Sequence, residues 1–132
     1  MIKFRAWDQR FSEFVKDFFV SEDGKIYKKT KDTGYGFAIS RETSDKIILM
    51  QSTGLRDLNG IEIFEGDIVR IFDSLYTVFY NIKEGSYQLE PHDDRWVIDY
   101  MSNFSSEESF EIVGNIYENK DILEDANETR NN

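Results

Sequence analysis

Residues 49–70 read LMQSTGLRDLNGIEIFEGDIVR, a stretch in which short apolar runs alternate with residues typical of tight turns. The turn residues are Thr53-Gly54, Asp57-Leu58-Asn59-Gly60 and Glu65-Gly66-Asp67. Glycine accepts positive φ, and Asn and Asp side chains hydrogen-bond backbone amides close to them in sequence. This stretch therefore predicts several short strands joined by tight turns, and it decides the fold class.

The rest of the chain continues this pattern of short β-rich segments. Alternation with a period of two, or a brief apolar run bounded by turn residues, is typical of strands. On this basis we predict strands at Ile2–Trp7, Phe18–Val20, Ile26–Tyr27, Ile47–Met50, Ile61–Ile63, Ile68–Phe72, Leu75–Ile82, Tyr87–Leu89 and Glu111–Tyr117. Gly114, inside the last of these, predicts a bulge or a close approach of the backbone.

The connecting segments have patterns of their own. Asp23-Gly24 predicts a hairpin turn, and Lys28–Gly36 predicts an exposed, mobile loop. Arg95–Phe104 fits either a strand or a helix, because its apolar residues match both periods. Asn119 is predicted to cap a short helix over Lys120–Asp125.

Composition supports a β-rich domain. Aromatic residues make up 15% of the 132 residues and proline occurs once, a mix that favours strands over helices, and we expect the rings to lie in the core. The predicted fold is mainly β, with α+β as the alternative: a small, strongly bent sheet or barrel of short antiparallel strands with a short C-terminal helix. We expect one domain over residues 1–125 and a polar, frayed tail over residues 126–132.

Charge is distributed unevenly along the chain. Residues 1–48 carry ten Lys/Arg and eight Asp/Glu, a net +2, whereas residues 49–132 carry six and eighteen, a net −12. Binding to a phosphate backbone needs clustered Lys and Arg, and only Lys25–Lys31 offers a basic cluster, so we do not expect nucleic acid as a partner. Two interpretations of the acidity stay open: a solvated surface, or a surface that imitates nucleic acid.

The residue inventory excludes several catalytic chemistries. Cysteine is absent, which excludes a thiol nucleophile and a cysteine zinc site, and His92 is the single histidine. Glu62, Glu65 and Asp67 lie together beside a tight turn. Shaping that turn is the first interpretation of these carboxylates, and general acid–base or metal-assisted chemistry is the second. We predict no metal and no cofactor.

We expect neither a membrane-spanning segment nor an export signal in these residues. The longest uninterrupted apolar run, Ile47–Met50, is far shorter than the ~20 residues of a membrane-spanning helix. Residues Met1–Asp8 do not contain the apolar region of a signal peptide. We therefore expect no membrane association and a cytoplasmic location.

Three segments together carry a family pattern: Ile2–Asp8 (IKFRAWD), Leu49–Val69, and Glu111–Asn119 (EIVGNIYEN). In this order and spread over the whole chain, they resemble the YopX family of small phage and prophage proteins. Departures are small: Ser52 stands where a larger residue is common, and Leu58 where a lysine often occurs.

This resemblance implies a mainly β or α+β fold in the cytoplasm of a bacterial host, and it carries over no established catalytic residue. The candidate binding residues are the motif positions with side-chain chemistry: Arg5, Trp7, Gln51, Thr53, Glu65, Asp67 and Asn115. Each of them also has a structural interpretation, in which it pairs a charge, packs, or satisfies backbone groups.

The expected function is a non-enzymatic phage or prophage accessory protein that binds a protein partner or assembles into homo-oligomers. One alternative is an acidic decoy that competes with DNA for a host DNA-binding protein. The other is a metal-dependent hydrolase that uses carboxylate ligands.

Overall fold

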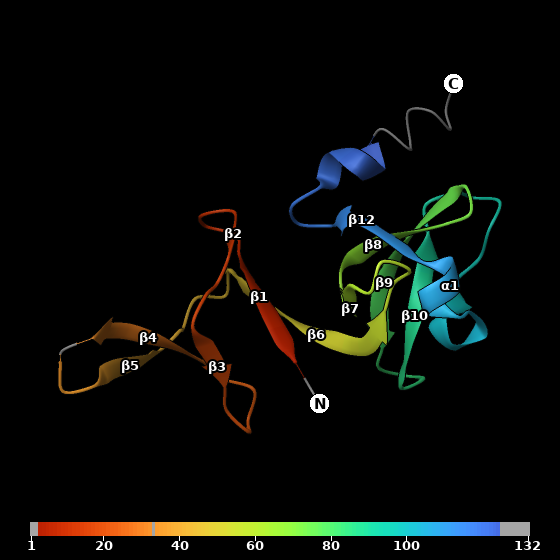
Figure 1. Cartoon of the computed structure of the whole chain (residues 1–132). Coiled ribbons are helices and arrows are strands. Elements are labelled where there is room, and N and C mark those ends of the chain that lie inside the picture. Colours follow the sequence, from red (N-terminus) through yellow and green to blue (C-terminus); the bar gives the residue numbers. More distant parts are fainter. Residues whose placement is uncertain (1–2, 33, 125–132) are drawn as a thin grey trace. The chain divides into compact units, whose positions relative to one another are not determined.

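The computed structural model describes residues 3–32 and 34–124, which form short β-strands with little helix (Figure 1). The chain divides into two compact units. The larger unit consists of Met1–Arg5 and Leu49–Asn132, and the smaller unit consists of Ala6–Ile48.

The predicted fold class is confirmed: the strands are antiparallel, the sheet is strongly curled, and a short helix occupies residues 120–124. The single domain over residues 1–125 stays a prediction, and the predicted tail over residues 126–132 lies outside the described residues. None of the helices in the described ranges is long and apolar enough to cross a membrane.

A five-stranded antiparallel sheet in the order β11-β10-β9-β8-β12 forms the larger unit's half-barrel (Figure 1). Strands β8, β9 and β10 follow one another through tight turns, so each pairs with its neighbour in sequence. The bounds are β8 Asp67–Ile71, β9 Ser74–Asn81, β10 Ser86–Pro91, β11 Asp99–Tyr100 and β12 Glu111–Asn115. Four of these strands, all except β11, are those predicted from the sequence.

The stretch that decides the fold contains β6 (Ile47–Arg56) and β7 (Glu62–Phe64), which pair in the larger unit. Their register shifts between Ser52 and Arg56, which marks a bulge in β6. The turn predicted at Thr53-Gly54 is therefore wrong, because the strand continues through it. Gly54 has a φ of +79°, and a bulge uses this conformation as readily as a turn does.

The other two turns of this stretch are confirmed. Asp57 accepts hydrogen bonds at Oδ1 from the backbone N–H groups of Asn59 and Ile61, both at 2.9 Å. Its Oδ2 accepts the N–H of Ile112 at 3.0 Å, so this buried carboxylate also fixes the start of β12. Gly66, with a φ of +86°, lies in the turn between β7 and β8.

Two short helices connect β11 to β12. They are η1 (Met101–Asn103) and α1 (Ser106–Ser109), of which α1 was not predicted from the sequence. The ambiguous segment Arg95–Phe104 contains both structures that its pattern fitted, since β11 is followed directly by η1.

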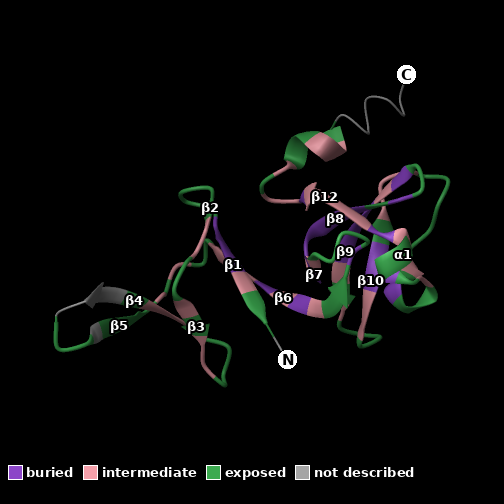
Figure 2. Ribbon diagram, in the orientation of Figure 1, coloured by how far each residue is buried: buried purple, intermediate pink, exposed green. Residues whose placement is uncertain are grey.

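The core lies inside the half-barrel, where Figure 2 shows buried residues gathered on β8, β9 and β10. Burying a large apolar side chain stabilises a fold by about 1.5–3 kcal/mol, so this cluster supplies most of the larger unit's stability. Its buried members are Ile63, Val69, Ile71, Tyr76, Val78, Leu89, Met101 and Phe110.

In the smaller unit, a three-stranded antiparallel sheet has the order β3-β4-β5. The hairpin predicted at Asp23-Gly24 is confirmed: it joins β3 to β4, and Gly24 has a φ of +82°. The strands are β1 (Phe4–Asp8, shared with the larger unit), β2 (Glu13–Phe14), β3 (Phe18–Val20), β4 (Ile26–Asp32) and β5 (Phe37–Arg41).

The exposed loop predicted over Lys28–Gly36 is wrong in its first part, because residues 28–32 belong to β4. Lys28 lies opposite Ser40, and Lys29 lies opposite Ile39. Lysine has a low intrinsic preference for strands, and here the partner strand β5 outweighs that preference.

The last strand shows the irregularity that Gly114 predicted. The register between β12 and β8 shifts between Ile112 and Gly114, and a Cβ atom on Gly114 would lie 2.6 Å from Oδ1 of Asn119. The helix begins after Asn119 as predicted, but the Asn119 side chain turns back, and its Oδ1 accepts the backbone N–H of Asn115 at 3.1 Å.

We predict that Gly114→Ala lowers the free energy of unfolding by about 1–3 kcal/mol, because the new methyl group overlaps the Asn119 side chain. Urea denaturation measures this loss. In an Asn119→Gly background the same substitution should cost less, since the overlapping atoms are gone. An equal cost in both backgrounds would contradict the close approach.

Candidate functional site

Asp67, the first residue of β8, is 2% exposed and lies at the centre of the predicted site residues. Its Oδ1 accepts a hydrogen bond from Nη2 of Arg5 at 2.7 Å, and its Oδ2 accepts the backbone N–H of Phe64 at 2.8 Å. Arg5 also donates to the carbonyl of Glu65 at 3.2 Å, and its guanidinium lies 4.8 Å from the centre of the Phe64 ring. Asp67 therefore joins the first residues of the chain to the β7–β8 turn.

Burying the charged Arg5–Asp67 pair costs free energy. Burial raises the pKa of Asp67 above its usual range, and the positive charge of Arg5 and the N–H of Phe64 act in the opposite direction. A carboxylate in this position needs both partners, because an unpaired buried charge costs several kcal/mol. The pair thus specifies how the chain is arranged around the turn.

Glu65 is half-buried in the same turn. Burial raises the pKa of its carboxyl group, while a hydrogen bond with the Gln51 backbone acts in the opposite direction. Two tyrosines, Tyr87 and Tyr117, lie near Glu65. Burial is the larger cause that raises the pKa of each tyrosine, and the negative charge of Glu65 raises it further. A carboxyl group with a raised pKa is a candidate proton donor or acceptor, although structural groups show such shifts too.

Gln51 and Thr53 lie on β6 and connect it to β7 and the turn. The carbonyl of Gln51 accepts the N–H of Glu65 at 3.0 Å. Oγ1 of Thr53 donates to the carbonyl of Ile63 at 2.8 Å and accepts the N–H of Leu55 at 3.1 Å. The Thr53 side chain therefore supplies hydrogen bonds where the bulge interrupts the strand pairing.

Asn115 ends β12 and organises the segment that follows. Its Oδ1 accepts the backbone N–H groups of Tyr117 at 3.0 Å and Glu118 at 2.7 Å. The next residue, Ile116, donates its N–H to the carbonyl of Gly66 at 2.9 Å. Asn115 thereby closes a turn next to the one that contains Glu65 and Asp67.

Trp7 belongs to the smaller unit, unlike the other six predicted site residues. It is buried, and its ring meets the ring of Phe14 edge to face, with centroids 4.9 Å apart. Trp7 therefore packs within that unit, and its predicted role in binding stays a prediction.

The arrangement around Asp67 satisfies backbone groups and holds charges in place. Within residues 3–32 and 34–124, no three His, Asp or Glu side chains are grouped closely enough to hold a metal ion. The single histidine, His92, contacts Oγ1 of Thr77 through its Nε2 at 2.5 Å. The contacts around Asp67 are structural, and Glu65, Tyr87 and Tyr117 are half-buried titratable groups near it. The predicted binding roles of the site residues stay predictions.

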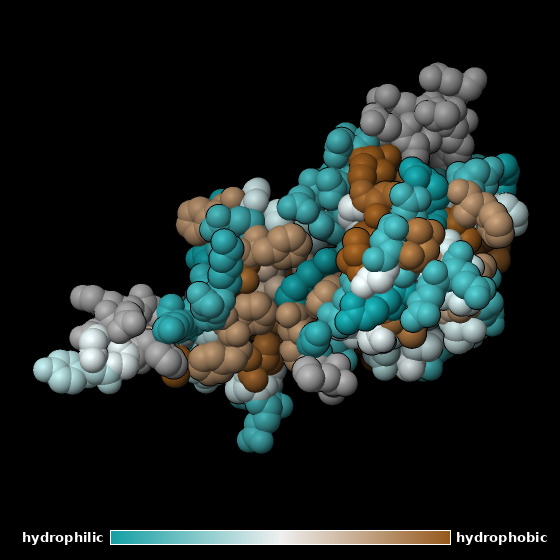
Figure 3. Space-filling view, viewed as in Figure 1, coloured by the Kyte–Doolittle hydropathy of each residue, from teal (hydrophilic) through white to brown (hydrophobic). Residues whose placement is uncertain are grey.

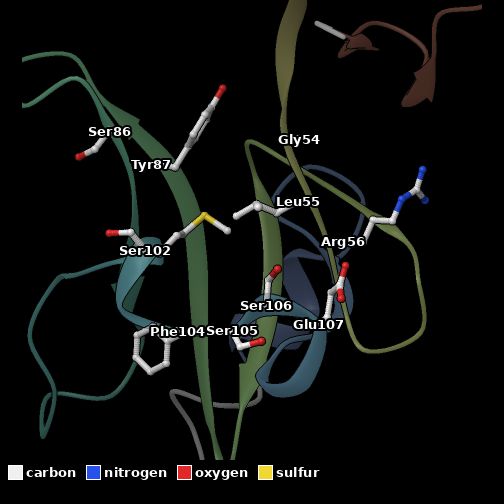
Figure 4. Close-up of a pocket in the computed structure, with 11 residues that line it drawn as sticks. Gly54, Leu55, Arg56, Ser86, Tyr87, Ser102, Phe104, Ser105, Ser106 and Glu107 are labelled. Atoms are coloured by element: carbon white, nitrogen blue, oxygen red, sulfur yellow. The ribbon is translucent and has the colours of Figure 1, made fainter.

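An open pocket of about 600 Å³ lies in the larger unit between β6, β10 and the two short helices (Figure 4). In that view Leu55 and Ser106 point into the space, while Arg56 points away, and Arg56 donates to the carbonyl of Gly60 at 2.7 Å. Histidine is not among the described lining residues, so the serines lack the base of a Ser-His pair. The lining includes the charged residues Arg56 and Glu107 and is otherwise made mostly of hydroxyl and apolar groups, chiefly Leu55, Ser86, Tyr87, Met101, Phe104 and Ser106.

A second feature of the larger unit is an exposed group of large apolar side chains, which we call the apolar surface. It borders a cavity of about 430 Å³ whose floor includes Ile71, Tyr76 and Phe104. Nε1 of its tryptophan donates to Oγ of Ser74 at 2.9 Å, which fixes the ring. The apolar surface consists of Phe72, Trp96, Val97 and Ile98, exposed by 91%, 49%, 81% and 55%.

Phe72 holds a backbone conformation that phenylalanine rarely adopts. It is the first residue of the two-residue loop between β8 and β9, and its φ is +57°. Type II′ hairpin turns have this positive φ and usually place glycine there. The left-handed region costs a residue with a side chain about 1–2 kcal/mol, and an exposed ring recovers little of it by packing. The fold alone therefore does not explain a phenylalanine at this position.

The apolar surface was not predicted from the sequence, because the aromatic rings were expected to lie in the core. Figure 3 shows apolar side chains reaching the surface among hydrophilic ones. One signal could have found it: the apolar triplet Trp96-Val97-Ile98 stands between the charged residues Asp93-Asp94-Arg95 and Asp99.

Comparisons with known proteins agree with this description. The model of the family described as "YopX protein" matches residues 3–124. Among solved structures, the chain is similar to protein EF1440 from Enterococcus faecalis, with 27% identity, a TM-score of 0.63, and coverage of 93% of this chain and 98% of that one. It is also similar to protein yopX from Bacillus subtilis, with 18% identity, a TM-score of 0.57, and coverage of 89% and 94%. No curated protein matches.

By its fold, this is a small β-protein whose larger unit is a curled half-barrel. Because the family model covers nearly the whole chain, the protein belongs to the YopX family. The resemblance carried by the three sequence segments is confirmed.

We predict a strong energetic coupling between Arg5 and Asp67. Arg5→Met should lower the free energy of unfolding by about 2–4 kcal/mol, because it leaves the Asp67 carboxylate buried without its cation. Asp67→Asn in that background should restore part of the loss. Urea denaturation of the two single variants and the double variant measures the coupling, and additive effects would contradict the pair.

We predict that Glu65→Gln stabilises the protein more as pH rises. The folded-state pKa of Glu65 lies above its ordinary value of 4.5, so its contribution to stability is fully present below that value and is lost as pH rises through the folded pKa. Glutamine does not ionise, so a protein with glutamine at this position does not lose this stability as pH rises. Melting temperatures from pH 4 to 8 should show an advantage of Glu65→Gln over the parent protein that grows as pH rises. A constant difference would contradict the raised pKa.

Proposed function

We propose that this protein is a phage or prophage accessory protein that acts in the cytoplasm of a bacterial host by binding another protein. The observation that carries the proposal is the apolar surface, where Phe72 and Val97 are almost fully exposed. Contiguous exposed apolar groups on a small domain are typical of an interaction site.

The composition of the apolar surface supports protein binding. Tryptophan and other large side chains that can enter a partner's pockets dominate the binding energy of protein interfaces. Trp96 is held by its hydrogen bond to Ser74, so its ring loses little freedom on binding. Phe72 has a backbone conformation that costs free energy, and its ring is exposed to solvent. This combination is expected for a residue whose side chain contributes to binding.

Protein binding is better supported than the decoy function. A DNA-mimicking surface must present its carboxylates to the partner. Asp57 and Asp67 are buried and hydrogen-bonded to backbone amides, so two of the carboxylates in residues 49–132 serve the fold instead. The apolar surface, by contrast, has no role in imitating nucleic acid.

Site-specific photocrosslinking tests the proposal. A benzophenone amino acid replaces Val97 in the tagged full-length protein, and cells of a bacterial host are irradiated and analysed by mass spectrometry after nuclease treatment. We expect a discrete crosslinked protein from position 97. Ile82 is the matched control, because it is an equally exposed aliphatic residue in the β9–β10 turn.

Identical crosslinks from positions 97 and 82 would contradict the proposal. If crosslinks form only between copies of this chain, the function is self-assembly and the binding of another protein is contradicted. Phe72→Asn gives a second check: asparagine tolerates positive φ, so this variant should melt at the same or a higher temperature and yet crosslink less from position 97.

A further inference from the structure

The apolar surface is bordered by acidic side chains, and this border bears on what the surface binds. Asp73 follows Phe72 in the turn, with its side chain 78% exposed. Asp93 and Asp94 precede the apolar triplet, and Asp99 follows it. These four aspartates form what we call the acidic rim.

One cation lies within the acidic rim, and aspartates of the rim engage it. Nε of Arg95 donates to Oδ2 of Asp93 at 2.7 Å, and its guanidinium also lies 4.0 Å from Asp73. Nearby on β8, Arg70 pairs with Glu111 on β12, which leaves that neighbouring site neutral. Four aspartates and one arginine give the rim a net charge of −3.

The field of the rim reaches into the cavity beside the apolar surface. Tyr76 lies on the cavity floor, and after burial, the charges of Asp99, Asp93 and Asp73 raise its pKa, while Arg95 lowers it. Asp73 and Asp99 line the cavity itself, and with Asp93 they lie close enough for their charges to act together on a group approaching it.

A second copy of the chain fits this surface poorly. In a two-fold symmetric dimer the same patch meets itself, so the rim aspartates of both copies would face each other. Like charges placed together across an interface cost free energy. Nucleic acid is disfavoured for the same reason, because its phosphates would meet the rim.

We propose that the apolar surface binds a basic amphipathic segment of another protein. This proposal rests on the function proposed above and names the chemistry of the partner. An apolar side chain of the segment enters the cavity over Ile71 and Tyr76, next to Phe72 and Val97. Its lysines or arginines pair with the acidic rim, which gives the contact both a centre that excludes water and complementary charge.

A peptide titration tests this partner chemistry. The probe is a fluorescein-labelled synthetic peptide of leucine and lysine arranged at helical spacing, with glutamine and glutamate versions in which the lysines are replaced. Anisotropy is measured with the full-length protein at several salt concentrations. We expect the lysine peptide to bind most tightly, the glutamate peptide least, and the affinity for the lysine peptide to fall with salt.

Paired variants locate the binding. Val97→Ser should weaken it about tenfold, whereas Ile82→Ser, at a similarly exposed site, should leave it unchanged. Asp73→Asn with Asp94→Asn should weaken binding and flatten its salt dependence. Asp121→Asn with Glu124→Gln removes the same charge from the C-terminal helix and should change neither. Equal effects of the rim and helix variants would overturn the proposal.

The remaining outcomes separate this proposal from the proposed function. If the glutamine peptide binds as tightly as the lysine peptide, the basic partner is overturned while the binding surface stands. If position 97 crosslinks a protein in cells but no peptide binds through Val97, the basic partner is likewise overturned and the binding surface stands. Self-association of the purified protein that Val97→Ser abolishes would identify a second copy as the occupant and overturn the proposal.

Discussion

The larger unit depends on one constraint: the carboxylate of Asp67 is taken out of water and must be satisfied within the fold. Arg5 and the N–H of Phe64 satisfy it, and in doing so they fix the β7–β8 turn against the start of the chain. Asp57 solves the same problem at the preceding turn with three backbone amides. A half-barrel of short strands has many turns, and buried side chains of this kind close them where strand pairing ends.

This constraint explains why the family motif is rich in acidic residues: buried carboxylates such as Asp57 and Asp67 hold its turns together. The motif residues in the larger unit bind backbone groups or each other, as Asn115 and Thr53 do. The features that the fold does not require lie elsewhere, at the β8–β9 turn and in residues 96–98. There the chain accepts a strained Phe72 and leaves apolar side chains in solvent. Structure and proposed function thus occupy different parts of the same half-barrel.

The local parts of this fold could be predicted from the sequence. Turns at Asp57–Gly60 and Glu65–Asp67 follow from the chemistry of the residues that form them, as does the bulge at Gly114. Long-range features could not be predicted. Arg5 and Asp67 are 62 residues apart, so their pairing is visible only once the strands are placed. The strand at residues 28–32 exists because β5 pairs with it, and the exposure of Phe72 depends on where the predicted strand Ile68–Phe72 leaves the sheet.

The most direct test of this division compares two folded variants in one binding measurement. Affinity for the leucine–lysine peptide is measured by anisotropy for Glu65→Gln, in the motif, and for Val97→Ser, in the apolar surface. If the motif is structural and the apolar surface binds, Glu65→Gln binds like the parent protein and Val97→Ser binds about tenfold more weakly. Loss of binding in Glu65→Gln with unchanged binding in Val97→Ser would contradict this account and assign the activity to the turn around Asp67.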